Sequence, residues 1–273
     1  MEIDHDIITA FKQFIWKYYR DNGRQFAWRN IDDPYGIVIS EIMLQQTQTY
    51  RVAPKYDLWI QAFPDFATLA QAPLRDVLTA WQGLGYNRRG MYTQKIAQKV
   101  MDEFNGELPS DPEILITFPG IGRNTAGSIN AFAFNKPVVF IETNIRAVFI
   151  HSFFKDKDKV HDNELLPLIA QTVDQENPRE WYYALMDYGV FLKQQCKNPS
   201  RKSAHHTKQS KFEGSDRQIR GQVIRLLTTQ PMPMSIEQLV GACNKDALRV
   251  QNIVDQLCSE LLLKCDGDLY RIF

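Results

Sequence analysis

LITFPGIGRNTAGSINAFAF, residues 115–134, holds two helical patterns that are separated by Pro119, Gly120 and Gly122. The glycines allow a sharp turn, and the second helix is predicted to begin near Asn124. Such a turn exposes the backbone amides of residues 120–124, which together with the dipole of the second helix favour a phosphate group. Small residues at 126 and 127 allow a close helix contact. The stretch is therefore predicted to be a helix-hairpin-helix that holds DNA phosphates. The residues predicted to hold them are Gly120, Gly122, Arg123, Asn124 and Thr125.

Around this hairpin the sequence is helical from Ile7 to about Lys193. Apolar residues recur there at three- and four-residue spacing, Pro and Gly punctuate the pattern, and strand-like alternation is scarce. This part of the chain is therefore predicted to be an all-α domain. Its clearest predicted helices are Ile37–Tyr50, Asp57–Phe63, Pro73–Gln82, Arg89–Asn105, Asp111–Thr117, Asn124–Phe134 and Glu180–Gln195.

The final part of the chain has a different pattern. It contains three predicted helices and then two strand-like runs, which are joined by the turn signal Asp266-Gly267-Asp268. The helices are about Asp216–Leu227, Ser235–Cys243 and Asp246–Leu261, and the runs are Leu262–Cys265 and Leu269–Phe273. This order is typical of a winged helix, a small α+β domain that binds either DNA or protein. The predicted organisation is an all-α core at 1–195, a basic linker at 196–214 and a winged-helix-like domain at 215–273.

Positive charge accumulates around the predicted linker. Between Lys193 and Arg225 the only acidic residues are Glu213 and Asp216, whereas Lys and Arg recur throughout. A charge run of this kind is by itself as often a solvated linker as a binding site. Its position just after a predicted phosphate-binding domain favours contact with DNA. The lysines predicted to contact phosphate are Lys202, Lys208 and Lys211.

Length and composition limit the function classes. A chain of 273 residues is long enough for one large and one small globular domain. Runs of about 18 apolar residues are absent from the sequence, and the amino terminus is acidic where a signal peptide would be basic. We expect a cytoplasmic, nucleoid-associated monomer without membrane contact. The net charge of zero means that any DNA-binding surface must be local, and the four cysteines are expected to be free thiols.

Two glutamates have surroundings that suit acid chemistry. Glu41 lies in an apolar helical pattern, where burial would raise its pKa, as a proton donor requires. Glu142 follows an apolar run and is predicted to begin a helix, whose amides would hold its carboxylate ionised. Hydrolysis of an N-glycosidic bond uses such a pair, because the leaving base needs a proton and the sugar becomes an oxocarbenium cation. An isolated Glu is more often an ordinary cap or an exposed acid, so these patterns alone leave both interpretations open.

Several short strings add weight to the catalytic interpretation. They are AWRN at 27–30, SEIMLQQTQ at 40–48, GLGY at 83–86, FPGIGRNTAG at 118–127, FIETNIRAV at 140–148 and ALMDYG at 184–189. In this order they resemble the catalytic core of the endonuclease III superfamily, and within it most closely the MutY-type adenine glycosylases. The resemblance extends over Pro34–Leu192, which is well over half of the chain.

The resemblance implies a two-lobed helix-hairpin-helix glycosylase that flips a base out of duplex DNA. Glu41 would protonate the adenine and then help water to attack. Glu142 occupies the place of an Asp that is usual in the family, and Asn144 matches an Asn that orders the site. The residues implied to form the base pocket and the wedge are Gln45, Gln46, Tyr86, Trp28 and Arg29.

The sequence also departs from the family pattern. Glu142 is one methylene longer than Asp, so its carboxylate must reach the sugar from further back or through a water. Asn124 stands where bifunctional members carry a Schiff-base lysine, which implies a monofunctional enzyme. Lys193 stands at the expected first cysteine ligand of an iron–sulfur cluster and only Cys196 is near, so no cofactor is expected. The basic linker is expected to replace the cluster loop without metal, ordered by packing of Phe212 and the winged helix.

The leading hypothesis is therefore a monofunctional glycosylase that removes adenine opposite guanine or 8-oxoguanine from double-stranded DNA. The winged-helix-like domain at 215–273 is too short to be the Nudix-like domain with which MutY-type enzymes recognise 8-oxoguanine. One alternative is excision of another base, namely thymine or uracil opposite guanine, or hypoxanthine. A second alternative is a DNA-binding protein without catalysis.

Overall fold

The structure is a computed structural model that describes residues 4–273. Glu2, which belongs to the acidic amino terminus noted above, lies outside the described residues. The chain divides into two compact units, each made of segments that are separate in the sequence. Unit 1 consists of Met1–Ile37, Ser110–Thr117 and Ile121–Lys208, and unit 2 consists of Val38–Pro109, Phe118–Gly120 and Gln209–Phe273. The domain boundaries predicted from the sequence stay predictions.

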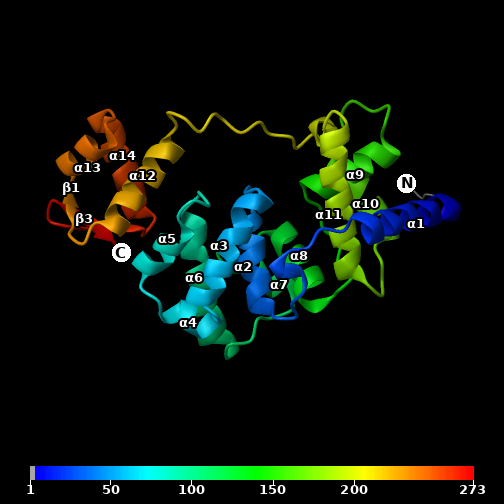
Figure 1. Cartoon of the computed structure of the whole chain (residues 1–273), viewed down its shortest axis with the longest axis horizontal. Coiled ribbons are helices and arrows are strands. Elements are labelled where there is room, and N and C mark those ends of the chain that lie inside the picture. The colour runs from blue at the N-terminus through cyan, green and yellow to red at the C-terminus, as the bar shows by residue number, and fades with distance from the viewer. Residues whose placement is uncertain (1–3) are drawn as a thin grey trace. The chain divides into compact units, whose positions relative to one another are not determined.

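Unit 1 is a group of helices around α11 (Pro178–Gln195). Helix α11 contacts α1 (His5–Asn22), α8 (Arg123–Phe134) and α9 (Thr143–Phe153), and Figure 1 shows α1 beside α11. The other helices of unit 1 are α7 (Pro112–Leu115), α10 (Asp162–Thr172) and the 3₁₀ helices η1 (Ala27–Arg29) and η2 (Pro199–Lys202).

Aromatic side chains form much of the core of unit 1. Phe132 stacks on Tyr183 with 4.5 Å between ring centroids. Gly127 lies so close to Phe140 that a Cβ at position 127 would be 2.6 Å from the Cβ of Phe140. Gly127 thus makes a close contact, but its partner is the segment before α9, whereas the sequence predicted a contact with another helix.

Unit 2 combines the middle of the chain with the C-terminal tail, residues 209–273. Leu78 and Met91 share one buried apolar cluster with Val223 and Leu227 of the tail. The tail is therefore part of the core of unit 2. The helices of unit 2 are α3 (Thr49–Ala62), α4 (Phe66–Gln71), α5 (Leu74–Trp81), α6 (Arg88–Phe104), α12 (Asp216–Thr229), α13 (Ile236–Cys243) and α14 (Ala247–Ser259), while α2 (Pro34–Leu44) crosses the boundary between the units.

The tail contains a small antiparallel sheet in the order β1-β3-β2. Strands β2 (Leu263–Asp266) and β3 (Leu269–Ile272) form the predicted hairpin, with Gly267 in its turn at a φ of 64°. Strand β1 (Met234–Ser235) was not predicted, because two residues are too short for a period-two pattern. The mostly helical chain with a small C-terminal sheet confirms the predicted fold class, and the winged-helix topology stays a prediction.

The helix boundaries agree with the sequence except in one region. The predicted helix Ile37–Tyr50 is wrong, because α2 ends at Leu44 and α3 begins at Thr49. Gln46, in the turn between them, has a φ of 55°, which is outside the helical region. The predicted helix Asp57–Phe63 is likewise part of the longer α3, which contains Pro54 in its interior. Within residues 4–273 no helix is both long and apolar enough to cross a membrane.

Candidate functional site

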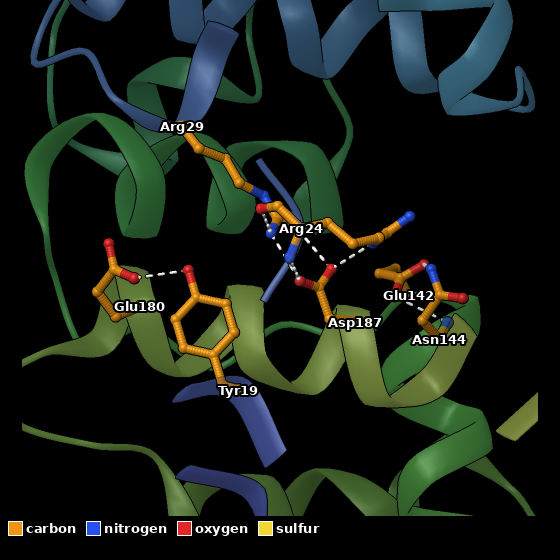
Figure 2. Close-up of polar contacts among 7 residues, drawn as sticks. All are labelled: Tyr19, Arg24, Arg29, Glu142, Asn144, Glu180 and Asp187. Carbon is orange, nitrogen blue, oxygen red and sulfur yellow. Dashed lines mark hydrogen bonds and ion pairs between the residues drawn. The ribbon is translucent and has the colours of Figure 1, made fainter. Parts of the chain in front are cut away.

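Glu142 is the N-cap of α9, as the sequence predicted. Its Oε1 accepts hydrogen bonds from the backbone amides of Asn144 at 2.7 Å and Ile145 at 3.0 Å. The side-chain amide of Asn144 donates to Oε2 at 3.2 Å, and Figure 2 shows these two side chains together. Three donors therefore hold the carboxylate of Glu142 in one orientation at the positive end of a helix.

Burial acts on the charge of Glu142 against these donors. Burial raises the pKa of its carboxyl, while the two amides, Lys193 and Asn144 lower it, and the net direction is upward. Lys193 is itself partly buried, and this lowers the pKa of its ammonium group. The expectation of a firmly ionised carboxylate is corrected, because burial outweighs the helix amides and places the pKa of Glu142 above its usual value.

Replacing Glu142 by Gln is expected to raise the melting temperature at neutral pH. A carboxyl whose pKa is higher in the folded state binds protons there more tightly than in the unfolded chain. The free energy of unfolding therefore falls as the pH rises from the unfolded-state pKa through the folded-state pKa. The substituted glutamine stays neutral and keeps an oxygen that accepts from the two backbone amides. Its NH2 group replaces Oε2, and a flip of the Asn144 side-chain amide presents the otherwise unpaired oxygen of Asn144 to it. Thermal unfolding should show Glu142→Gln above wild type at about pH 7.

This stability difference should shrink as the pH falls toward the ordinary pKa of Glu, because the wild-type carboxyl is then protonated in both states. Glu103→Gln, which breaks only an ion pair with Lys99 at an exposed position of α6, should change the melting temperature little. A wild-type protein more stable than Glu142→Gln at every pH would contradict the inferred burial cost.

A buried ion pair lies next to this cap in unit 1. Asp187 of α11 accepts from both terminal nitrogens of Arg29 at 2.8 Å, from the backbone N of Arg24 at 2.8 Å and from its Nε at 2.7 Å (Figure 2). Burial opposes the charge of Asp187, but the hydrogen bonds and charges of Arg29 and Arg24 hold its pKa below the usual value. The pair fastens the segment after α1 to α11, and sequence reasoning missed it because the partners are 158 residues apart.

Trp28 and Arg29 were predicted to belong to the base pocket. The structure places both side chains in the interior of unit 1, where Trp28 stacks on Phe26 at 4.8 Å and the guanidinium of Arg29 lies over Tyr183. In this position they support the fold around Asp187. Their contact with a base stays a prediction.

Glu41 lies on α2 in a distinctive environment. All residues from Tyr35 to Met43 are buried except Glu41, which is only half-buried. The expected full burial of Glu41 is therefore corrected. A single partly exposed carboxyl within the buried stretch 35–43 can meet a substrate and still be flanked by apolar side chains.

Arg89 organises the turn after α2. Its guanidinium is buried and donates to the backbone oxygens of Ile42 at 2.8 Å and Gln45 at 2.6 Å, as well as to that of Leu84 at 3.1 Å. Burial lowers the pKa of Arg89 to about 10. One side chain thus ties the end of α2 to the GLGY loop. The sequence did not indicate this role, since Arg89 lies in no recognised motif.

The structure brings Gln45, Gln46 and Tyr86 together around one pocket of unit 2 with a volume of about 420 Å³. Tyr86 has a φ of 49° and a half-exposed ring that lies over the guanidinium of Arg89. The family resemblance implied that these three residues form the base pocket and the wedge, and their contact with a base stays a prediction. The other residues that line the pocket are Asn87, Arg88, Arg89, Tyr92, Arg220 and Glu260.

The predicted hairpin turn is present. Gly120 has a φ of 77°, and a Cβ there would be 2.7 Å from the ring of Tyr92, so both conformation and space require glycine. Gly122 is the N-cap of α8, which begins at Arg123. Asn124 is exposed, and its side-chain oxygen accepts from the backbone N of Ile141 at 3.4 Å. The phosphate contacts of Gly120, Gly122, Arg123, Asn124 and Thr125 stay predictions.

The basic linker is fastened at its start and again near its end, where Gln209 donates to the hydroxyl of Tyr86 and the backbone oxygen of Ser210 accepts from Arg217. Ser203 forms a β-bridge with Val160, and the ammonium of Lys202 donates to the backbone oxygen of Lys155 at 2.7 Å. Residues 204–211 have neither helix nor strand, and Lys208 and Lys211 are exposed. Phe212 is 59% exposed, so the expectation that its packing orders the linker is wrong. Among residues 4–273 no three His, Cys, Asp or Glu side chains gather as metal ligands would.

The sequence is similar to that of known DNA repair proteins. Residues 39–168 match the HhH-GPD superfamily of base excision DNA repair proteins. The adenine DNA glycosylase of Buchnera aphidicola subsp. Baizongia pistaciae is 35% identical over 188 residues, which are 67% of this chain and 53% of that protein. The adenine DNA glycosylase of Mus musculus is 32% identical over 231 residues, 80% of this chain and 44% of that protein. The chain thus spans about half the length of these two relatives.

Further similar proteins are one more curated relative and two solved structures. The adenine DNA glycosylase of Mycobacterium tuberculosis (strain CDC 1551 / Oshkosh) is 27% identical over 272 residues, which cover 90% of this chain and 88% of that protein. A thermostable thymine-DNA glycosylase aligns with a TM-score of 0.62 at 23% identity, over 68% of this chain and 87% of that one. Endonuclease III in a non-covalent DNA complex aligns with a TM-score of 0.59 at 17% identity, over 74% and 99%. The two solved structures show a shared fold.

Proposed function

The chain belongs to the HhH-GPD superfamily of base excision DNA repair proteins, and from this premise we propose that it is a DNA glycosylase that excises adenine paired with guanine or 8-oxoguanine. The observation that carries the proposal is the carboxylate of Glu142, which three donors orient at the start of α9. A carboxylate fixed in this way suits the stabilisation of a cationic sugar. The choice of adenine is supported by the names of the relatives in Buchnera aphidicola and Mus musculus. In this proposal the protein acts as a monomer on double-stranded DNA, in the cytoplasm at the nucleoid.

The proposed reaction gives each glutamate one task. Glu41 donates its proton to a ring nitrogen of adenine, and the electron pair of the glycosidic bond leaves with the base. The sugar becomes an oxocarbenium cation, which the carboxylate of Glu142 stabilises. Water adds to the anomeric carbon and returns a proton to Glu41. Asn144 keeps Glu142 oriented through its 3.2 Å hydrogen bond.

A panel of duplexes tests the choice of base. Adenine is placed opposite guanine, 8-oxoguanine, cytosine and thymine, while further duplexes carry thymine or uracil opposite guanine, or hypoxanthine. We expect base release only from the adenine mispairs with guanine and 8-oxoguanine. Release of another base alone would overturn the adenine assignment, and binding without any release would favour a DNA-binding protein instead.

The enzyme is also proposed to be monofunctional. Asn124 carries an amide that accepts a hydrogen bond from Ile141 and has no nucleophilic amine, so a Schiff base cannot form at this position. Incubation with abasic duplex DNA and borohydride should therefore yield little trapped covalent complex. High-yield trapping would contradict the assignment. An Asn124→Lys variant is the informative comparison, because an increase in trapping would show that the position can reach the abasic sugar.

We further propose that residues 196–214 work without an iron–sulfur cluster and contact phosphate through Lys208 and Lys211. The exposure of both lysines supports this proposal. Neutralising both lysines should weaken DNA binding equally for all sequences and flatten its dependence on salt by about one unit of slope per phosphate contact. An unchanged salt slope would exclude the contacts, and iron and sulfide in the purified protein would exclude the metal-free linker.

A further inference from the structure

The pocket around Gln45, Gln46 and Tyr86 has a second wall, which comes from the C-terminal tail. Arg220 of α12 and Glu260, the residue after α14, line this pocket. The two residues are 40 apart in sequence and form an ion pair that is about one-fifth exposed on each side. The tail therefore contributes charged groups directly to the pocket.

The tail also holds the aromatic residue of the pocket in place. Arg217, on the same helix as Arg220, donates to the hydroxyl of Tyr86 at 3.0 Å, and Gln209 donates to the same oxygen. The guanidinium of Arg217 also lies 5.8 Å from the centre of the Tyr86 ring. These contacts give the ring of Tyr86 a defined position beside Arg220.

The charges of the pocket suit a ligand with both donors and acceptors. Two guanidinium groups, from Arg88 and Arg220, supply N–H donors, while Glu260 supplies acceptors and lies 3.8 Å from Arg88. The guanidinium of Arg89 also lines the pocket, but backbone oxygens already engage its terminal nitrogens. The carboxylate of Glu260 pairs with Arg220 and Arg88 and so neutralises part of their charge, which makes a backbone phosphate a weaker match than a ligand that also offers donors. A guanine edge matches better, because it offers the acceptors O6 and N7 and also N–H donors. A volume of about 420 Å³ is within the range of ligand pockets and leaves room for a purine.

We propose that Arg220 and Glu260 of the tail recognise the guanine or 8-oxoguanine that lies opposite the excised base. Arg220 donates to the carbonyl edge of the purine, and Glu260 accepts from its ring N–H. Tyr86, positioned by Arg217, offers a face on which the purine stacks. The tail thereby acts as a specificity element of the enzyme. This inference rests on the proposed function, which supplies the mispaired DNA.

Binding of the full chain to duplexes with a tetrahydrofuran abasic analogue separates base recognition from catalysis. The analogue is placed opposite guanine, 8-oxoguanine, cytosine or a second tetrahydrofuran, which lacks a base. The wild-type protein should bind the first two more tightly than the last. Arg220→Gln should reduce that preference about tenfold, the size of one bidentate base contact, and leave the affinity for the base-free duplex unchanged. Glu260→Gln, which keeps the shape of the side chain, should reduce the preference for guanine as well.

Arg225→Gln is the matched control, because Arg225 is an exposed arginine of α12 that does not line the pocket. It should leave the preference unchanged. An equal loss of affinity for all four duplexes in Arg220→Gln would identify a phosphate contact and overturn the proposal. An unchanged preference for guanine and 8-oxoguanine in both pocket variants would also overturn it. The two proposals can fail separately. If the wild-type protein releases no adenine but the Arg220→Gln variant loses the preference for guanine, the proposed function is refuted and the pocket assignment stands.

Discussion

Glu41→Gln is expected to lower the rate of adenine excision by roughly 10²–10⁴-fold, the contribution typical of a general acid. Gln has nearly the shape of Glu but cannot deliver a proton to the leaving base. Glu41 is the only residue between Tyr35 and Met43 that is not buried, so a neutral amide there should leave the fold intact. Single-turnover kinetics on a duplex with adenine opposite 8-oxoguanine measures the chemical step.

The binding constant for the same duplex should change little in Glu41→Gln, because the lost proton acts in the transition state. Glu103→Gln, on the exposed side of α6, provides the control and should retain the wild-type rate. Undiminished excision by Glu41→Gln would remove Glu41 from the mechanism. A comparable loss in Glu103→Gln would mean that the assay responds to any lost carboxylate.

Asp187→Asn is expected to lower the free energy of unfolding by about 3–5 kcal/mol, the cost of leaving one partner of a buried ion pair uncompensated. The guanidinium of Arg29 would stay in the interior without its counter-charge, since the Asp187 side chain is 1% exposed. Urea unfolding at neutral pH, followed by tryptophan fluorescence, measures the loss. The buried Trp28 and Trp181 in unit 1 make this signal sensitive to the region.

The effect of Asp187→Asn should depend on pH with a defined sign. The pKa of Asp187 is depressed in the folded protein, so the ion pair stabilises above the ordinary pKa of Asp and loses its contribution as the pH falls through the folded-state pKa. The gap between wild type and variant should therefore narrow in acid. Asp21→Asn, which breaks the exposed pair with Lys17, should leave the unfolding midpoint unchanged. Equal midpoints for Asp187→Asn and wild type at neutral pH would contradict the structural role.

Local sequence signals were sufficient for several parts of the molecule. The Gly120 turn, the hairpin at Gly267 and the cap at Glu142 each depend on interactions within a few residues, so the amino-acid pattern indicates them directly. The amphipathic spacing of α5 and α6 likewise reports which helix face is buried. For these elements the cause and the signal lie in the same short stretch of chain.

Other features depend on residues that are distant in the chain, and there the sequence was silent or misleading. Arg29 contacts Asp187, which is 158 residues away, and Arg89 donates to the backbone oxygen of Ile42, which is 47 residues away. The sequence around either arginine does not indicate which residue it binds. The same holds for the raised pKa of Glu142, since burial is produced by packing around it. Arg220 and Glu260 became pocket residues only because the tail joins the core of unit 2. Local conformation depends on residues that are neighbours in the sequence, so the sequence predicts it. Burial and long-range partners are determined only when the chain has packed.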